Sequence, residues 1–146
     1  MVEYLRALSF KQPWLEMILR GEKRMETRNW KRDIDPNEPI LFHASREFDA
    51  TGSDITRFYK QKSECRMGAI VGVGYIYNIV EFENYEKFRH YRPEHLLDKW
   101  FWPVKYGWEL RHVSRLETPI PKRGYLGFWK VHREQLSEEI LNRTYL

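Results

Sequence analysis

The stretch that most constrains the fold of this 146-residue chain is residues 8–30, LSFKQPWLEMILRGEKRMETRNW. An apolar run at residues 5–10 leads into it and predicts a strand. Pro13 follows at a place where only the first turn of a helix tolerates proline. Gly21 can adopt the left-handed conformation that commonly ends a helix. The sequence therefore predicts a strand and then a short helix between Pro13 and Gly21.

Side-chain spacing supports this order. Trp14, Met17 and Ile18 are three and four residues apart, which places them on one helix face. Residues 24–28 alternate charged side chains with Met and Thr, and a period of two predicts a second strand with a charged face. The helix joins the strands through two polar corners, at residues 11–12 and 22–23, and we expect function there.

The same residues carry a family resemblance. SFKQPW followed by GEKRMETR is similar to the Gln-Pro-Trp and Gly-x-Lys-x-x-Glu-x-Arg motifs of ASCH domains, a branch of the PUA-like superfamily. Later blocks resemble that family in the same order: PILFHAS, GAIVGVG, WFWPVKYGWEL and PIPKRGYLGFWKV. The resemblance implies an α+β fold in which a small mixed β-barrel of about five to six strands has flanking helices. It also implies a single domain, residues 1–146, of the small standalone prokaryotic type.

For function, the resemblance implies a cleft suited to RNA, DNA or a nucleobase. Gln12 offers both a donor and an acceptor to a base edge, and Glu26 can accept from an exocyclic amine. Lys23 and Arg28 can hold a phosphate or a carbonyl oxygen. A second interpretation stays open, in which Glu26 and Arg28 form a structural ion pair that braces the sheet.

Aromatic and cationic side chains alternate from Tyr85 to Trp108. Bases stack on such rings, at about 1 to 3 kcal/mol per base, but a small core needs the same residues. Trp102 and Tyr106 stand beside a proline and a glycine, and we expect these two rings at the cleft. The complete predicted nucleic-acid site is Lys11, Gln12, Trp14, Lys23, Glu26, Arg28, Ser45, Trp102 and Tyr106.

A hydrolase is the alternative function, either a nucleoside amidohydrolase or a ribonuclease using Lys23 and Glu26. The resemblance implies this because some ASCH members are amidohydrolases that use Lys, Thr and Glu. Glu26 occupies the position of their Thr nucleophile, and Thr27 would point to the opposite strand face. Ser9 and Ser45 are substitute nucleophiles, with His43 as a base two residues from Ser45. A protein-interaction module of coactivator type is the third interpretation.

The placement of charge favours a polyanionic partner. Residues 1–32 hold eight basic and four acidic side chains, so the whole net charge of +4 lies on this segment. This excess predicts a basic cleft that binds nucleic acid in a salt-dependent way. An ordinary solvated face is the competing interpretation.

The rest of the chain predicts the remaining strands and helices. We expect strands at residues 40–44, 69–82, 108–115 and 124–131, with a Pro-rich turn ETPIPKRG between the last two. Gly72 and Gly74 are expected to let the sheet curl. Helices are expected at residues 49–63 and 133–142, the second as a lid on the core through Leu136 and Ile140.

Bulk properties add expectations about the environment. A single cysteine, Cys65, excludes an internal disulfide framework, and no apolar run approaches the roughly 20 residues that span a bilayer. The chain begins almost directly with a strand, so we expect no signal peptide and a cytoplasmic, monomeric protein. His90 and His95 lack further ligands at a recognisable spacing, so neither a metal nor another cofactor is expected.

Overall fold

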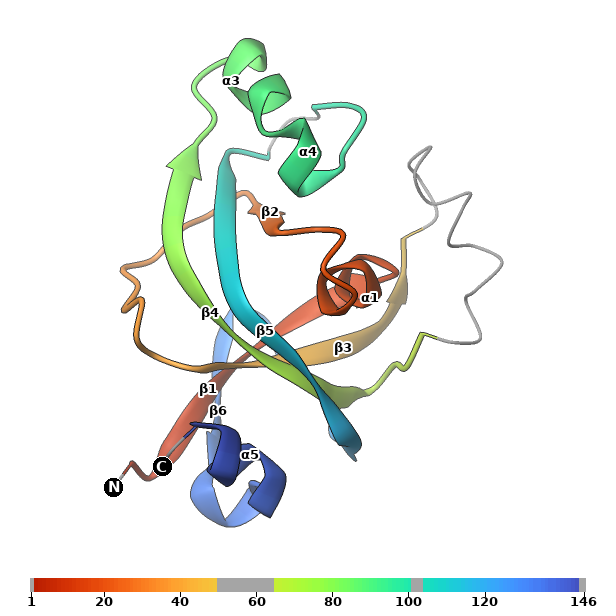
Figure 1. Ribbon diagram of the computed structural model, residues 1–146, viewed down its shortest axis with the longest axis vertical. Coiled ribbons are helices and arrows are strands. Elements are labelled where there is room, and N and C mark those ends of the chain that lie inside the picture. Colours follow the sequence, from red (N-terminus) through yellow and green to blue (C-terminus); the bar gives the residue numbers. More distant parts are fainter. Residues whose placement is uncertain (1, 50–64, 101–103, 145–146) are drawn as a thin grey trace.

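The computed structural model describes residues 2–49, 65–100 and 104–144. One six-stranded mixed sheet dominates them, in the order β2-β5-β4-β3-β1-β6 (Figure 1). The strands are β1 (Tyr4–Gln12), β2 (Met25–Arg28), β3 (Ile40–Phe48), β4 (Ala69–Glu81), β5 (Tyr106–Pro121) and β6 (Phe128–His132). The helices are α1 (Trp14–Leu19), α3 (Tyr85–His90), α4 (Arg92–His95) and α5 (Glu138–Thr144), with a 3₁₀ turn η2 (Arg133–Gln135) before α5.

The sheet is curled but does not close. β1 pairs in parallel with β3, and every other described pairing is antiparallel. β2 and β6 form the two edges and are not hydrogen-bonded to each other. The predicted α+β class, mixed sheet and strand number are confirmed, and the barrel-like sheet is an open one.

Two glycines of β4 allow close packing on the curled sheet. A Cβ on Gly72 would lie 2.6 Å from the Leu19 side chain of α1 and 2.9 Å from the carbonyl oxygen of Ser114. A Cβ on Gly74 would lie 2.6 Å from the Phe42 ring. Any larger residue would push the helix or the neighbouring strand away. The architectural role predicted for both glycines is confirmed.

The alternation of β1 divides the core between its two faces. Leu8 and Phe10 belong to one buried cluster, whereas Leu5 and Ala7 belong to another. Leu136 and Ile140 cover the second cluster, as predicted for the C-terminal lid. The predicted helix at residues 133–142 is instead divided into η2 and α5, and the Ser137 hydroxyl accepts a hydrogen bond from the Ile140 amide at the start of α5.

Two further stretches differ from the sequence predictions. α3 and α4 were not expected in the aromatic segment; Asn84 caps α3 by accepting from the Lys87 amide, at 2.9 Å. Phe88 of α3 is buried against Phe82 and Trp100. Residues 117–121 of the expected turn extend β5 and pair with β4, so the β5–β6 loop is only residues 122–127. Most of the helix expected at 49–63, and Trp102, lie outside the described residues.

None of the helices in the described ranges is long and apolar enough to cross a membrane.

Candidate functional site

The opening segment forms one wall of a cleft. Helix α1 begins after Pro13 and ends before Gly21, which adopts φ +79. The amides of Glu22 and Lys23 donate to the carbonyl oxygen of Met17, which turns the chain sharply into β2. After this turn, Glu26 and Arg28 of β2 line the same cleft as Trp14 of α1.

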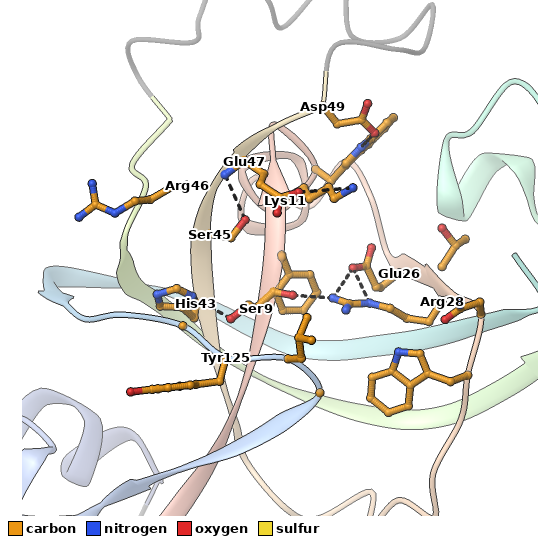
Figure 2. A pocket seen from close by; sticks show the side chains of 18 of the residues that line it. Ser9, Lys11, Glu26, Arg28, His43, Ser45, Arg46, Glu47, Asp49 and Tyr125 are labelled. Atoms are coloured by element: carbon orange, nitrogen blue, oxygen red, sulfur yellow. Dashed lines mark hydrogen bonds and ion pairs between the residues drawn. The ribbon is translucent and has the colours of Figure 1, made fainter. Parts of the chain in front are cut away.

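The cleft has a volume of about 1160 Å³. Its walls come from β1, β2 and β3, from the segment that follows α4, and from the β5–β6 loop. Figure 2 shows Glu26 and Arg28 on one side, His43 and Ser9 across from them, and Tyr125 on the loop. Segments that are distant in the sequence therefore meet around one hollow.

An ion pair lies in this cleft. Arg28 donates from Nε and Nη2 to Glu26 Oε2, at 3.1 and 2.8 Å, and from Nη2 to the carbonyl oxygen of Ser9, at 2.7 Å (Figure 2). Its guanidinium also lies 5.3 Å from the centroid of the Phe10 ring. Within the described part of the chain, Glu26 Oε1 and Arg28 Nη1 make no hydrogen bond. One acceptor and one donor thus remain available to a ligand.

Lys23 is held against the same wall with little exposure. Its side chain is 2% exposed, and Nζ donates to the carbonyl oxygen of His95 at 2.5 Å. Nζ also lies 5.0 Å from the centroid of the Trp14 ring. Lys23 lines the cleft, but its ammonium is aimed by α4 and by the indole rather than extended into solvent.

The residue that holds Lys23 is kept neutral. Burial lowers the pKa of His95 to about 4, although its hydrogen bond to the Phe88 carbonyl oxygen opposes that shift. His95 Nε2 donates to this oxygen at 2.8 Å, and Nδ1 accepts from the Leu97 amide at 2.9 Å. Both ring nitrogens are therefore used in fixing the loop that carries the Lys23 anchor.

A serine–histidine pair lies on the opposite side. His43 Nε2 must donate to the Lys122 carbonyl oxygen, at 2.7 Å, because that oxygen can only accept. Nδ1 then accepts from the Ser9 hydroxyl at 2.9 Å, and Ser9 accepts from Trp129 Nε1 at 3.3 Å. Burial lowers the pKa of His43, which favours this neutral form. The arrangement is a hydroxyl beside a neutral base within a cleft.

Comparison with known proteins now identifies the family. The model of the ASCH domain matches residues 8–120. The chain belongs to the ASCH domain family. ASCH domains are generally thought to bind RNA. A search of curated proteins gives no match.

Solved structures agree on the ASCH fold. The ASCH protein of Zymomonas mobilis has 14% identity and a TM-score of 0.67, over 94% of this chain and 93% of that chain. A tyrosine-to-phenylalanine mutant of that protein gives 15% identity and a TM-score of 0.66, over 97% and 96% of the two chains. A serine-to-alanine mutant gives 15% and 0.64, over 89% of each. At such identity the likeness speaks for the fold alone.

The ASCH motif residues separate into those that line the cleft and those that do not. Of the predicted set, the residues lining the cleft are Lys11, Trp14, Lys23, Glu26, Arg28 and Ser45. Gln12 does not: its side chain is fully buried, with Nε2 donating to the Arg66 carbonyl oxygen and Oε1 accepting from the Glu16 amide, each at 2.9 Å. The predicted base-reading role of Gln12 is therefore replaced by a structural one, because both its polar atoms are already used.

Two other predicted contacts also differ. Tyr106 lines a separate, smaller hollow, where the Lys31 ammonium lies 5.6 Å from its ring centroid. His43 pairs with Ser9 rather than with Ser45, since Ser9 and His43 are register partners of β1 and β3. Ser45 Oγ instead accepts from the Glu47 amide, at 3.3 Å.

Sequence reasoning missed the contribution of the β5–β6 loop. Lys122, Arg123, Tyr125 and Leu126 all line the cleft. The signal was present in PKRGYLG, where two cations precede a short turn that holds an aromatic residue between two glycines. Among the described residues, no three His, Cys, Asp or Glu side chains gather as a metal ion would require.

Proposed function

We propose that this ASCH domain binds single-stranded RNA, with one nucleotide in the cleft. The observation that carries the proposal is the half-used Glu26–Arg28 pair. Glu26 Oε1 can accept from an exocyclic amine, while Arg28 Nη1 can donate to a base carbonyl or a phosphate. Because Arg28 is fixed by Ser9 and Phe10, these groups are positioned before a ligand arrives.

The charge of the lining residues supports a polyanionic ligand. Four acidic side chains line the cleft: Glu26, Glu47, Asp49 and Asp98. Seven basic side chains line it: Lys11, Lys23, Arg28, Arg46, Lys99, Lys122 and Arg123. Only three of the seven come from residues 1–32, so the positive excess of that segment describes the cleft incompletely. The net positive lining supports contacts with phosphates and a salt-dependent affinity.

The size and aromatic lining of the cleft support a strand rather than a free base. Pockets for drug-sized ligands measure roughly 300 to 1,000 Å³, and this cleft holds about 1160 Å³. Trp30 lines it in a half-buried position, with its ring edge-on to Trp108 at a centroid distance of 4.9 Å. A fixed indole at the wall of a basic hollow can stack on a base.

Fluorescence anisotropy with a labelled single-stranded RNA of about 12 nucleotides tests the proposal. We expect binding at low salt that weakens as salt rises, with a slope that reflects several neutralised phosphates. Arg28→Ala should weaken it, whereas Arg111→Ala removes an exposed arginine outside the cleft lining and should not. Equal effects of the two substitutions, or an affinity indifferent to salt, would contradict the proposal. Single-stranded DNA of the same sequence measures the selectivity for RNA.

A second candidate function is hydrolysis of an acyl ester carried on a nucleoside, and the Ser9–His43 pair is the observation that favours it. The Ser9 hydroxyl would attack the ester carbonyl as His43 Nδ1 takes its proton. His43 would return that proton to the departing alcohol, and water would then release the acid from Ser9. Nucleosides that carry acyl esters form the test panel. Turnover no faster than that of Ser9→Ala on every substrate would remove this candidate.

A further inference from the structure

The tip of the β5–β6 loop exposes apolar surface beside the cleft. Leu126 is 99% exposed and Tyr125 is 56% exposed. Of the large hydrophobic side chains that are exposed in the described ranges, only these two line the cleft. Burying a leucine side chain is worth about 1.5 to 3 kcal/mol, so a leucine held entirely in solvent forgoes a stabilisation that a ligand can supply.

The loop behind this tip is firmly attached. His43 Nε2 donates to the Lys122 carbonyl oxygen, and the Lys122 amide donates to the Gly68 carbonyl oxygen at 3.1 Å. Gly124 packs directly on the serine–histidine pair, since a Cβ there would lie 2.5 Å from His43 Cε1 and 2.6 Å from Ser9 Oγ. The exposed side chains therefore project from a fixed base.

The surroundings of the tip determine which ligand it suits. The Arg123 guanidinium lies 5.8 Å from the Tyr125 ring centroid, and the Tyr125 ring meets Trp129 at a centroid distance of 5.4 Å. Two apolar side chains beside the Arg123 cation are too small a surface for a stable protein interface. The two side chains match the size of unpaired nucleobases. The faces of these bases are apolar, and the strand that carries them has an anionic backbone.

We propose that Tyr125 and Leu126 form a stacking site for the nucleobases next to the nucleotide in the cleft, with Arg123 facing the phosphate between them. A nucleotide in the cleft is separated from its neighbours in the strand, and their exposed faces need another surface. The tyrosine ring offers a stacking platform, and leucine acts as an apolar wedge of the kind that separates base steps. This inference rests on the proposed RNA-binding function.

Ligands of different length test it. Wild type, Tyr125→Ala and Leu126→Ala are compared for binding of a 5′-mononucleotide and of a single-stranded RNA of about seven nucleotides. We expect each substitution to weaken seven-nucleotide binding about tenfold, as loss of one stacked base predicts, and to weaken mononucleotide binding much less, because a mononucleotide has no neighbouring base to stack. Tyr85→Ala is the matched control, because Tyr85 is 51% exposed on α3 and does not line the cleft. Thermal unfolding establishes that all variants are folded.

The outcomes separate the inference from the function on which it rests. Wild-type binding of the seven-nucleotide RNA with no loss in either loop variant overturns the stacking site alone. Equal losses for both ligands also overturn it, because the loop would then act on the cleft nucleotide. If the wild type binds neither ligand, the proposed function fails and the stacking site fails with it. A 2-aminopurine base beside the cleft nucleotide should change its fluorescence on binding wild type, and less with Tyr125→Ala.

Discussion

Two clusters of this protein each consist of a buried glutamate bonded by arginine. They differ in how many of the carboxylate oxygens accept hydrogen bonds. Glu16 of α1 is 4% exposed, and both of its oxygens accept hydrogen bonds. Arg115 donates to Oε1 and Oε2, at 2.9 and 2.6 Å, and Arg20 donates to Oε2 at 2.7 Å. Glu26 is also buried, at 8% exposure, but only its Oε2 is used, by Arg28.

The difference indicates which cluster braces the fold and which one faces a ligand. The Glu16 cluster ties α1 to β5, both carboxylate oxygens of Glu16 are used, and none of its three residues lines the cleft. The Glu26–Arg28 pair lines the cleft with one acceptor and one donor to spare. A buried ion pair is weak evidence for stability by itself; the count of unused atoms is the more informative property.

Removing Glu16 is expected to have the largest effect, and it should fall on stability. Glu16→Ala leaves Arg115 and Arg20 without their shared partner, and we expect a loss of about 3 kcal/mol in the free energy of unfolding. Urea unfolding measures it. RNA affinity of the folded variant should be unchanged, and a parallel loss of affinity would erase the distinction between the clusters.

Removing Arg28 should show the opposite pattern. We expect Arg28→Ala to weaken RNA binding about thirtyfold, equivalent to about 2 kcal/mol, because a base- or phosphate-binding arginine is lost. Its effect on unfolding should be smaller than that of Glu16→Ala, because Arg28 bonds Glu26 on its own strand and one carbonyl oxygen, whereas Glu16 joins α1 to β5 through two arginines. Anisotropy titrations and urea unfolding of the same sample give both numbers; a variant that loses stability but binds normally would reverse the assignment.

Acid should act on the Glu16 cluster with a defined sign. Burial raises the pKa of Glu16, but hydrogen bonds and charge from Arg115 and Arg20 outweigh it and lower the pKa below the ordinary value of 4.5. The folded state therefore binds this proton more weakly than the unfolded chain. The contribution is complete above pH 4.5 and is lost as the pH falls through the folded value.

Unfolding free energies measured between pH 3 and 6 test that sign. Glu16→Gln cannot titrate, so its stability should fall less steeply with acid than that of the wild type. We expect this pH-dependent loss in the free energy of unfolding to be smaller than the loss caused by Glu16→Ala. Parallel curves for the two proteins would show that the Glu16 cluster does not contribute to acid sensitivity.

An exposed pair gives the smallest expected effect on stability. Lys11 and Glu47 are 3.6 Å apart, with side chains 60% and 70% exposed. A double-mutant cycle should yield a coupling below about 0.5 kcal/mol, because solvent screens both charges. A coupling above about 1 kcal/mol would contradict the expectation that solvent exposure weakens such ion pairs.

Local sequence patterns predicted the opening strand, the helix between Pro13 and Gly21, and the second strand. Proline and glycine set these boundaries through the backbone, and apolar spacing set the buried faces. Patterns failed where distant segments decided the outcome. Residues 117–121 read as a Pro-rich turn, yet they continue β5 because β4 offers a partner strand.

The candidate site divides in the same way. The motif residues Lys23, Glu26 and Arg28 line the cleft, at a spacing that follows from a short helix and a strand, and their role in binding nucleic acid stays a prediction. Gln12 and Tyr106 were expected there too. The Gln12 side chain is instead hydrogen-bonded to the Arg66 carbonyl oxygen and the Glu16 amide, and Tyr106 lines another hollow. The identity of a residue does not reveal whether neighbouring backbone groups already use the hydrogen-bonding atoms of its side chain.

Residues a few positions apart were enough to specify the order of the strands, the buried face of the first helix and the family motif. The packing of the folded chain was needed to show that Ser9 meets His43, that both oxygens of Glu16 but only one of Glu26 accept hydrogen bonds, and that residues 122–127 form a wall of the cleft. The Ser9–His43 and Glu16–Arg115 contacts join segments that are 34 and 99 residues apart in the chain. Their geometry follows from sheet register and curvature, which local periodicity does not specify.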